Sequence, residues 1–497
     1  MQINTNVLFL RSQCAILFVM LLWGFAIITG CSSSSGTYAG SNIVTTQFGS
    51  LRGYSESGAS IYKGIPYAAP PVGDHRWRAP QDPARWIGLR DATKPASACT
   101  QEIYTRQWNS LATGSNSGGG DALSSNYTGS EDCLYLDVYT PQNTKTPLPV
   151  YVFIHGGSNN KGDAQVYDGT TLAVREKMIV VVIQYRLNAL GWFSNYALKN
   201  TAENVWDASG NYGTLDQIKA LTWVQNNIAA FGGDPAKVTI GGQSAGANAV
   251  LNMIVSPLTD GLFSKAVALS PAMSLVSTDT TSPTPVTLSN LMIDWLLQND
   301  GTATNMATAD TYRLSMNSEA VTSYLRNKPA LKILEACIEA NLRLTGVGTM
   351  PSHSPYMDGN VLPATDWVNT IKTGNYHHVP LIIGNAEYEM KSIMPVRAFA
   401  ASVKAASCGA GFCIPSSVYN WSHLESAVLD APSTLTLGQV LPLPTDRDIY
   451  GTGSLLSSAM WKATYTDAVA DALMTSDSSN VIYAYLFQWN GGTDARC

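Results

Sequence analysis

The chain has 497 residues, of which 45% are hydrophobic and 13% are charged, and its formal net charge is −6. This composition is typical of a globular protein, although it is low in charge. An acidic chain without a cluster of basic residues argues against binding to nucleic acid.

The first thirty residues predict a targeting segment. Arg11 is their only charged residue, and it precedes an apolar run over 14–28 that is short for a membrane span. The run closes on Ile28-Thr29-Gly30-Cys31, which resembles the lipobox of bacterial lipoproteins, where the cysteine is acylated. An ordinary signal peptide or an uncleaved anchor is the alternative.

This resemblance implies a signal peptide over 1–30 and a lipid on Cys31. The Ser/Gly-rich residues 31–41 would then form a flexible tether. Ser32 after the cysteine is similar to outer-membrane sorting signals. We therefore expect a protein that crosses the inner membrane and stays anchored through Cys31, facing the periplasm or the outer surface.

Short strands and tight turns are predicted first after the tether, and the polar residues 114–130 are predicted to be loop. Several later apolar runs suit strands that are covered on both faces, and a further run suits a late strand. The expected strands are 43–46, 49–53, 62–67, 134–139, 149–154, 179–185, 237–241, 265–270, 379–383 and 481–487.

Helices are predicted between these strands. Residues 214–231 carry apolar side chains at helical spacing, and helical material dominates 286–347. Alternating strands and helices predict an α/β fold with a large, mostly parallel sheet and helices on both faces. No repeat or second linker divides residues 42–497, so we expect one domain there.

Six of the eight cysteines lie beyond Cys31. Cys408 and Cys413 are the closest pair, but they lack a second pair or a neighbouring histidine, so a small disulfide loop is favoured over a metal site. The sequence does not assign partners to Cys337 and Cys497. No metal and no cofactor are expected.

Gly242-Gln243-Ser244-Ala245-Gly246 is the strongest local motif. A short buried strand is predicted before it and a helix after it. In that setting G-x-S-x-G is typical of a strained turn that presents a nucleophilic serine hydroxyl. The sequence therefore predicts Ser244 as the nucleophile of an acyl-transfer reaction.

A second turn has the features of an oxyanion hole. His155-Gly156-Gly157-Ser158 follows the predicted strand that ends at Ile154, and a glycine-rich turn can expose backbone N–H groups. We expect the N–H groups of Gly157, Ser158 and Ala245 to bind the oxyanion. His155 is expected to shape the turn and not to act as the base.

Several longer motifs resemble those of the type-B carboxylesterases, a family that includes cholinesterases and para-nitrobenzyl esterases. The resemblance covers roughly residue 42 to the C-terminus, and it rests on segments in the family's order: 64–68, 131–138, 185–187, 210–217 and 231–246. It implies an α/β-hydrolase fold, small ester substrates, and a triad of serine, glutamate and histidine. Gln243 stands where cholinesterases carry a glutamate, which weakens the case for a cationic choline substrate.

The family's acid follows a strand in a G-x-x-x-x-E pattern. Here Gly384 begins that pattern and selects Glu389, with Glu387 as the alternative. The resemblance implies that this carboxylate orients the base and stabilises the imidazolium. Met390 replaces the usual glycine after it.

The histidine of the family follows the late strand, but no histidine follows residue 487 here. We expect each of the six histidines to be structural or exposed: His75, His155, His353, His377, His378 and His423. Two explanations stay open: the sequence is a fragment that lacks its last part, or the protein does not hydrolyse esters efficiently. The sequence stops within a predicted loop, at Cys497, and we expect a fragment for this reason.

The resulting hypothesis is a lipid-anchored serine carboxylesterase acting through Ser244 and Glu389, with the histidine absent from this chain. The alternative is a catalytically inactive, esterase-like binding module. A lipase for long-chain esters is a third hypothesis, which the polar loop over 114–130 does not decide. The sequence does not indicate the acyl and alcohol specificity or the oligomeric state.

The resemblance also implies three structural pairs. Cys99 and Cys133 flank the polar loop, and the family pairs cysteines at these two places. Arg76 with Glu131 and Arg186 with Asp216 match charged pairs of the family and are expected to be buried.

Overall fold

A computed structural model describes residues 42–102, 127–387, 389 and 455–487, apart from 273–274, 278–282, 347, 349, 352 and 457. These residues belong to one unit of contacts, Gly40–Cys497. The predicted signal peptide, the tether, lipidated Cys31, the Cys408–Cys413 pair, His423 and Cys497 lie outside the described residues.

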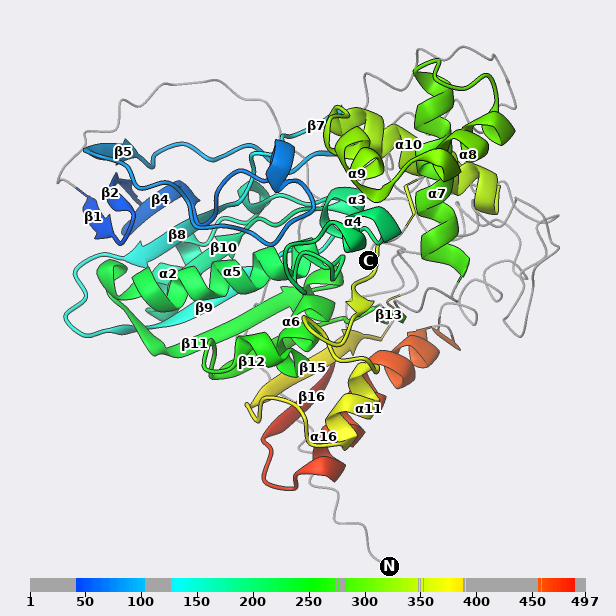
Figure 1. Cartoon of the computed structure of the whole chain (residues 1–497). Coiled ribbons are helices and arrows are strands. Elements are labelled where there is room, and N and C mark those ends of the chain that lie inside the picture. The colour runs from blue at the N-terminus through cyan, green and yellow to red at the C-terminus, as the bar shows by residue number, and fades with distance from the viewer. Residues whose placement is uncertain are drawn as a thin grey trace, which may run out of the picture. The chain divides into compact units, whose positions relative to one another are not determined.

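The central feature is a nine-stranded sheet with the order β16-β15-β12-β11-β9-β10-β8-β4-β3 (Figure 1). The strands from β16 to β10 pair in parallel, and β8, β4 and β3 are antiparallel to their neighbours. The bounds of these strands are β3 Tyr54–Glu56, β4 Ala59–Pro66, β8 Tyr135–Pro141, β9 Leu148–Ile154, β10 Ile179–Ile183, β11 Gly233–Gln243, β12 Lys265–Leu269, β15 Leu381–Ala386 and β16 Ile482–Phe487.

Three smaller groups of strands accompany the large sheet. β1, β2 and β5 form a three-stranded sheet, whereas β6 pairs with β7 and β13 with β14. Their bounds are β1 Ile43–Thr46, β2 Gly49–Arg52, β5 Leu89–Asp91, β6 Gln101–Glu102, β7 Tyr127–Thr128, β13 Val276–Ser277 and β14 Tyr356–Met357.

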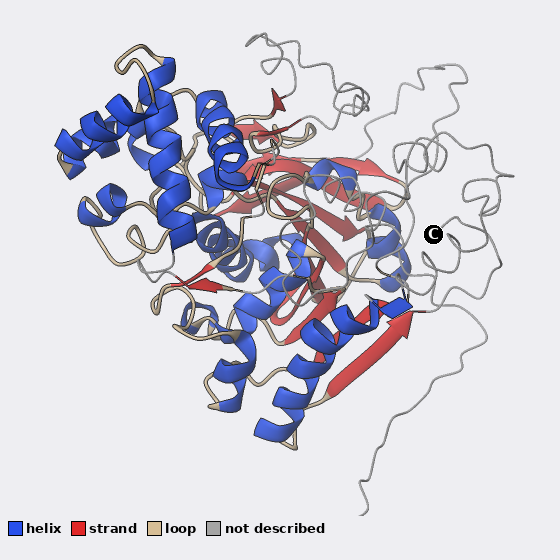
Figure 2. Ribbon diagram, turned by 90° about the vertical axis from the view of Figure 1, so that its right-hand side faces the viewer, coloured by secondary structure: helices blue, strands red, loops and turns tan. Residues whose placement is uncertain are grey.

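Helices cover the large sheet, whose strands lie in the interior (Figure 2). The helix α2 packs against β8 and β10, with Val180 and Val182 in its apolar cluster, whereas α6 packs against β11 and β12. The bounds are α2 Thr170–Glu176, α3 Asn188–Gly191, α4 Tyr196–Asn200, α5 Tyr212–Asn227, α6 Ala245–Val255, α11 Trp367–Lys372 and α16 Ala468–Ser476, with shorter helices η1 Gly73–His75, η2 Ala164–Val166, η3 Ile228–Phe231, η4 Pro257–Thr259 and η5 Ala463–Asp467.

Four further helices form a layer with a core of its own, at the upper right of Figure 1. We call them the helical layer: α7 Pro283–Asn299, α8 Met306–Ser315, α9 Ser318–Arg326 and α10 Ala330–Thr345. Buried Leu296, Leu325 and Ile333 belong to its apolar cluster, which also includes Trp77 and Phe193 from the segments beside the sheet.

The predicted fold class is confirmed, because the sheet is mostly parallel and helices accompany it. The strand before Ser244 is longer than predicted. It begins at Gly233 and not at Lys237, because an irregularity in the pairing with β9 lets the chain join the sheet earlier. No helix among the described residues is long and apolar enough to cross a membrane.

Candidate active site

Ser244 lies at the junction between β11 and α6. Its backbone adopts φ 56° and ψ −122°, a conformation that is rare for a residue with a side chain. The flanking glycines permit the turn, because a Cβ at Gly242 would lie 2.2 Å from the Gly246 carbonyl oxygen and a Cβ at Gly246 would lie 2.0 Å from that of Ile154. The predicted strained turn at Ser244 is therefore present, with the side chain half-buried.

The glycine-rich turn after β9 passes directly beside this serine. A Cβ added to Gly156 would lie 3.2 Å from the Ser244 Cβ and 2.6 Å from the Gln243 carbonyl oxygen. Gly157, Ser158 and Asn159 follow with φ values of 116°, 57° and 59°, so three successive residues are left-handed. The turn approaches Ser244 closely because it carries no side chain at Gly156.

Two N–H groups of this turn are available to a ligand. Among the described residues, no group accepts a hydrogen bond from the N–H of Gly157 or Ser158. Ala245 is the first residue of α6, a position whose N–H has no partner inside its helix. Of the three residues predicted for the oxyanion hole, Gly157 and Ser158 thus lie on the turn beside Ser244, and Ala245 directly follows Ser244.

Glu389 follows β15, which pairs with β12 on the side opposite to β11. Its Oε1 accepts a hydrogen bond from the Ala386 N–H at 2.8 Å and another from the hydroxyl of Ser270. Ser270 directly follows Leu269, whose carbonyl oxygen accepts the Ser244 N–H at 2.9 Å. The last residues of β12 therefore lie between the serine and the carboxylate.

The alternative acid, Glu387, is placed differently. Its N–H donates to the Phe487 carbonyl oxygen at 2.9 Å and so continues the pairing of β15 with β16. The Glu389 carboxylate accepts a hydrogen bond from the Ser270 hydroxyl. Glu389 thus contacts Ser270 at the end of β12, next to the residue that accepts the Ser244 N–H, and Glu387 stays the alternative.

Sequence reasoning did not identify Ser270. Its backbone has φ 52°, and its N–H donates to the Gly384 carbonyl oxygen at 2.7 Å. The position of Ser270 in the sequence could have indicated its contact. It is the last residue of the predicted strand 265–270, which lies between the strand before the nucleophile and the strand before the acid.

His155 has a structural role in the turn, as predicted. It is buried, its Nδ1 donates to the Gly156 carbonyl oxygen at 2.9 Å, and its ring stacks on Tyr185 at 4.4 Å between centroids. Burial lowers the pKa of His155 to about 4, against the weaker effect of the Gly156 carbonyl, so the ring is neutral near pH 7.

The other described histidines also contact groups outside the site. His377 and His378 precede β15, at the opposite end of that strand from Glu389, and bind the Ser256 carbonyl oxygen and Asp477. His353 is buried against Cys337, and His75 is exposed on η1. None of these contacts involves Ser244 or Glu389.

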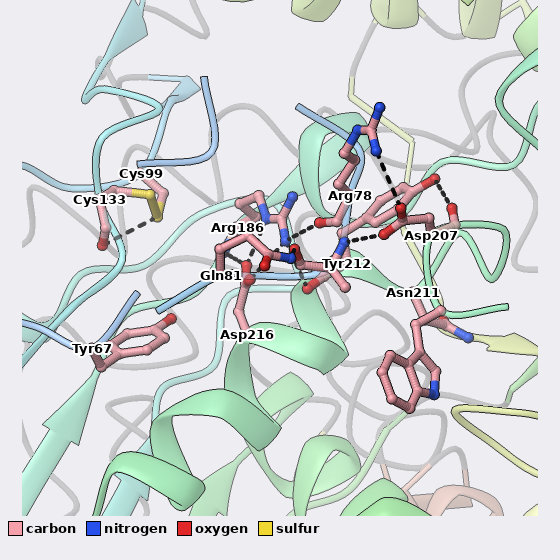
Figure 3. Close-up of polar contacts among 12 residues, drawn as sticks. Tyr67, Arg78, Gln81, Cys99, Cys133, Arg186, Asp207, Asn211, Tyr212 and Asp216 are labelled. Carbon is pink, nitrogen blue, oxygen red and sulfur yellow. Dashed lines mark hydrogen bonds and ion pairs between the residues drawn. A yellow bond between two sulfur atoms is a disulfide. The ribbon is translucent and has the colours of Figure 1, made fainter. Parts of the chain in front are cut away.

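The predicted disulfide and the two predicted ion pairs are confirmed. Cys99 and Cys133 are bonded with their Cα atoms 5.0 Å apart. Arg76 binds both oxygens of Glu131, and the guanidinium of Arg186 binds both oxygens of Asp216 at 2.8 Å (Figure 3).

The pair of Arg186 and Asp216 fixes the start of α5 below the site. Both side chains are buried, and Arg186 also donates its backbone N–H to Asp216 at 3.0 Å. Burial raises the pKa of Asp216, but Arg186 opposes this effect with its charge and its hydrogen bonds. We conclude that the pair is ionised and holds the segment after β10 against α5.

The fold and the placement of the serine define an α/β-hydrolase. Residues 40–493 match the model of the carboxylesterase family, and the chain belongs to this family. A solved PNB esterase is similar to the chain at a TM-score of 0.60 and 27% identity, over 90% of this chain and 80% of that one.

Curated relatives match over a shorter span. Human cocaine esterase is 40% identical over 267 residues, which is 51% of this chain and 45% of the relative. The para-nitrobenzyl esterase of Bacillus subtilis is 42% identical over 231 residues, 45% of this chain and 42% of the relative. In these two matches the chain spans less than half the length of the relative.

Proposed function

We propose that the protein is a serine carboxylic ester hydrolase that forms an acyl-enzyme on Ser244. The observation that carries this proposal is the arrangement at one edge of the sheet. A strained serine stands between a turn with two unbonded N–H groups and a carboxylate bonded to Ser270. Family membership supports the same reaction class.

In the proposed reaction, the Ser244 Oγ attacks the carbonyl carbon of the ester and a general base takes its proton. The carbonyl oxygen becomes an oxyanion that accepts hydrogen bonds from the N–H groups of Gly157, Ser158 and Ala245. The alcohol leaves with the proton that the base returns. Water then attacks the acyl group by the same route and releases the acid.

We propose that Glu389 orients the base and stabilises its protonated form. Its hydrogen bonds from Ser270 and from the Ala386 N–H would hold the carboxylate in one orientation. None of the five described histidines contacts it or Ser244. We propose that none of these five histidines supplies the base, and His423, which lies outside the described residues, is tested separately below.

The substrate class proposed is small, neutral carboxylic esters. Gln243, next to the nucleophile, brings no negative charge to the site, which weakens the case for a cationic alcohol. The relatives named cocaine esterase and para-nitrobenzyl esterase are consistent with esters of varied alcohols.

The proposal is tested by hydrolysis of p-nitrophenyl acetate with increasing imidazole, which supplies a diffusible base. We expect a near-background rate without imidazole and a saturable gain with it, beyond the reaction of imidazole and ester alone. Ser244→Ala should show no gain, and Glu389→Gln a smaller one. Enzymes with a triad keep only a residual rate when one member is removed, and this residual rate is the one expected without imidazole.

The variant His423→Ala separates the outcomes. A wild type that works at full rate without imidazole and loses this rate in His423→Ala would place the base within the chain. An imidazole-dependent rate that survives in Ser244→Ala would refute the acyl-enzyme. A wild type with no gain at all would leave the esterase-like binding module as the function.

We also propose that the protein is anchored to a membrane through a lipid on Cys31. The support is the sequence Ile28-Thr29-Gly30-Cys31 after an apolar run. Expression in a Gram-negative host with a labelled fatty acid should label the wild type and not Cys31→Ser. Equal labelling of both, or of neither, would contradict the anchor.

A further inference from the structure

A set of buried polar contacts joins the helical layer to the oxyanion turn. Cys337 on α10 lies with its Sγ 3.6 Å from Nε2 of His353, and the other ring nitrogen, Nδ1, lies 2.8 Å from Oδ1 of Asn160. Asn160 follows directly on the left-handed residues of the turn after β9. The catalytic groups proposed above do not include any of these three side chains.

The direction of these hydrogen bonds follows from chemistry. An amide oxygen only accepts, so Nδ1 of His353 must carry the proton that it donates to Asn160. Burial lowers the pKa of His353 to about 4, so the ring is neutral and its Nε2 is an acceptor. Burial also raises the pKa of the Cys337 thiol, which therefore keeps its proton and donates it to Nε2. One tautomer satisfies all three groups.

The backbone of the same segment reinforces the contact. The Asn160 Nδ2 donates to the Pro351 carbonyl oxygen at 2.8 Å, and the Asn159 Nδ2 donates to that of His353 at 2.7 Å. The Asn160 N–H closes the turn on the Gly157 carbonyl oxygen at 3.0 Å. Asn160 thus bonds to Gly157, whose N–H is proposed to bind the oxyanion, and also to Pro351 and His353 in the segment before β14.

Three successive left-handed residues need such support. Ser158 and Asn159 carry side chains, and this backbone conformation persists only where the surrounding contacts determine it. The N–H directions of Gly157 and Ser158 depend on these backbone angles. Contacts that fix Asn159 and Asn160 therefore fix the donors as well.

We propose that Cys337, His353 and Asn160 form a hydrogen-bonded relay through which the helical layer positions the N–H groups of Gly157 and Ser158. The three are positioning residues and touch no substrate. The proposal rests on the proposed esterase function for its effect on rate, but the placement of the turn can be measured without activity.

The test compares two substitutions of nearly equal shape. His353→Asn keeps an N–H near the position of Nδ1, whereas His353→Leu removes it. With imidazole present, we expect His353→Leu to lower kcat for p-nitrophenyl acetate by about 10-fold to 100-fold with KM within about twofold, because misplaced oxyanion donors act on the transition state. His353→Asn should recover most of that loss.

A matched control is His377→Leu, since His377 also bonds a protein oxygen, the Ser256 carbonyl, but lies away from the turn. It should leave kcat and KM unchanged. The amide shift of Gly157 in protein labelled with 15N-glycine is the readout that needs no activity. The Gly157 amide shift should change in His353→Leu. It should be close to the wild-type value in His353→Asn and in His377→Leu.

Each possible result either supports or refutes the proposed relay. If His353→Leu keeps both the wild-type kcat and the Gly157 shift, or if His353→Asn fails like His353→Leu, the relay is refuted. If wild type shows no Ser244-dependent hydrolysis, the proposed function fails and the Gly157 shift alone decides the positioning. If His353→Leu does not fold, Cys337→Ala removes the thiol donor and should give a smaller change of the same kind, and no change would overturn the proposal.

Discussion

The edge of the sheet around Ser244 and the helical layer differ in how they are held. At the sheet edge, backbone pairing of β9, β11 and β12 sets the positions of the turns, and Arg186 with Asp216 joins the segment after β10 to α5. The helical layer has a separate apolar cluster and reaches the turns through polar side chains from distant segments. The proposed chemistry lies in the first region, and the proposed relay of Cys337, His353 and Asn160 connects the second region to it.

Both regions contain a buried arginine pair, and this allows a direct comparison. Arg186 and Asp216 are joined through two side-chain hydrogen bonds, whereas Arg313 of the helical layer binds Asp294 at 2.8 Å and also Asp310. Removing Asp216 leaves Arg186 buried without its counter-charge, but removing Asp294 leaves Arg313 beside Asp310.

We therefore expect Asp216→Ala to lower the free energy of unfolding by about 3–5 kcal/mol. Asp294→Ala should cost less, about 1–3 kcal/mol, because a charged partner remains. Urea unfolding followed by circular dichroism measures both. Equal losses would show that the two regions do not differ in this respect.

The disulfide between Cys99 and Cys133 ties the segments that flank the sheet edge, with a sequence separation of 34 residues. Closing a loop of this length restricts the unfolded chain, so the double variant Cys99→Ser with Cys133→Ser should lose about 4 kcal/mol of stability. A double variant as stable as wild type would contradict this role.

Asp137 of β8 is a buried carboxylate near the same edge, and the Gly64 N–H donates to its Oδ1 at 2.8 Å. Burial raises the pKa of Asp137 to about 6, against the weaker effect of that hydrogen bond. Because the folded pKa lies above the unfolded one, this group stabilises the protein below about pH 4, and that contribution is lost as the pH rises through 6.

Asp137→Asn should remove this dependence and keep the acceptor for Gly64. Relative to wild type, the variant should gain stability on the order of 2 kcal/mol between pH 4 and pH 7. Melting temperatures of both proteins across this range provide the measurement. A difference that stays constant with pH would show that Asp137 does not titrate in this window.

The sequence predicted the strained turn at Ser244 and the glycine-rich turn after β9, because both patterns are local. Ser244 and Gly157 sit in short glycine-containing turns between apolar strands, and such turns can be recognised in a single segment. Glu389 was implied by the resemblance, through the family's G-x-x-x-x-E pattern after one strand, and the structure places it against Ser270. Ser270 was missed because its contact depends on the order of strands in the sheet.

The helical layer was predicted only as helical material. Its contact with the turn joins Asn160 to His353 and Cys337, which are separated by nearly two hundred residues from it in sequence. Nothing in the local pattern of α10 indicates this partner, and a lone buried cysteine is usually inert. Such tertiary contacts are set by packing and could not be predicted from periodicity.

Ser244 is the proposed nucleophile of the site, and its reactivity is the decisive property. The most direct measurement is peptide mapping by mass spectrometry after reaction with an aryl fluorophosphonate, with and without imidazole. We predict one adduct per chain, on the peptide that contains Ser244, formed faster with imidazole and absent in Ser244→Ala. An adduct on another residue, or none in the presence of imidazole, would contradict the account.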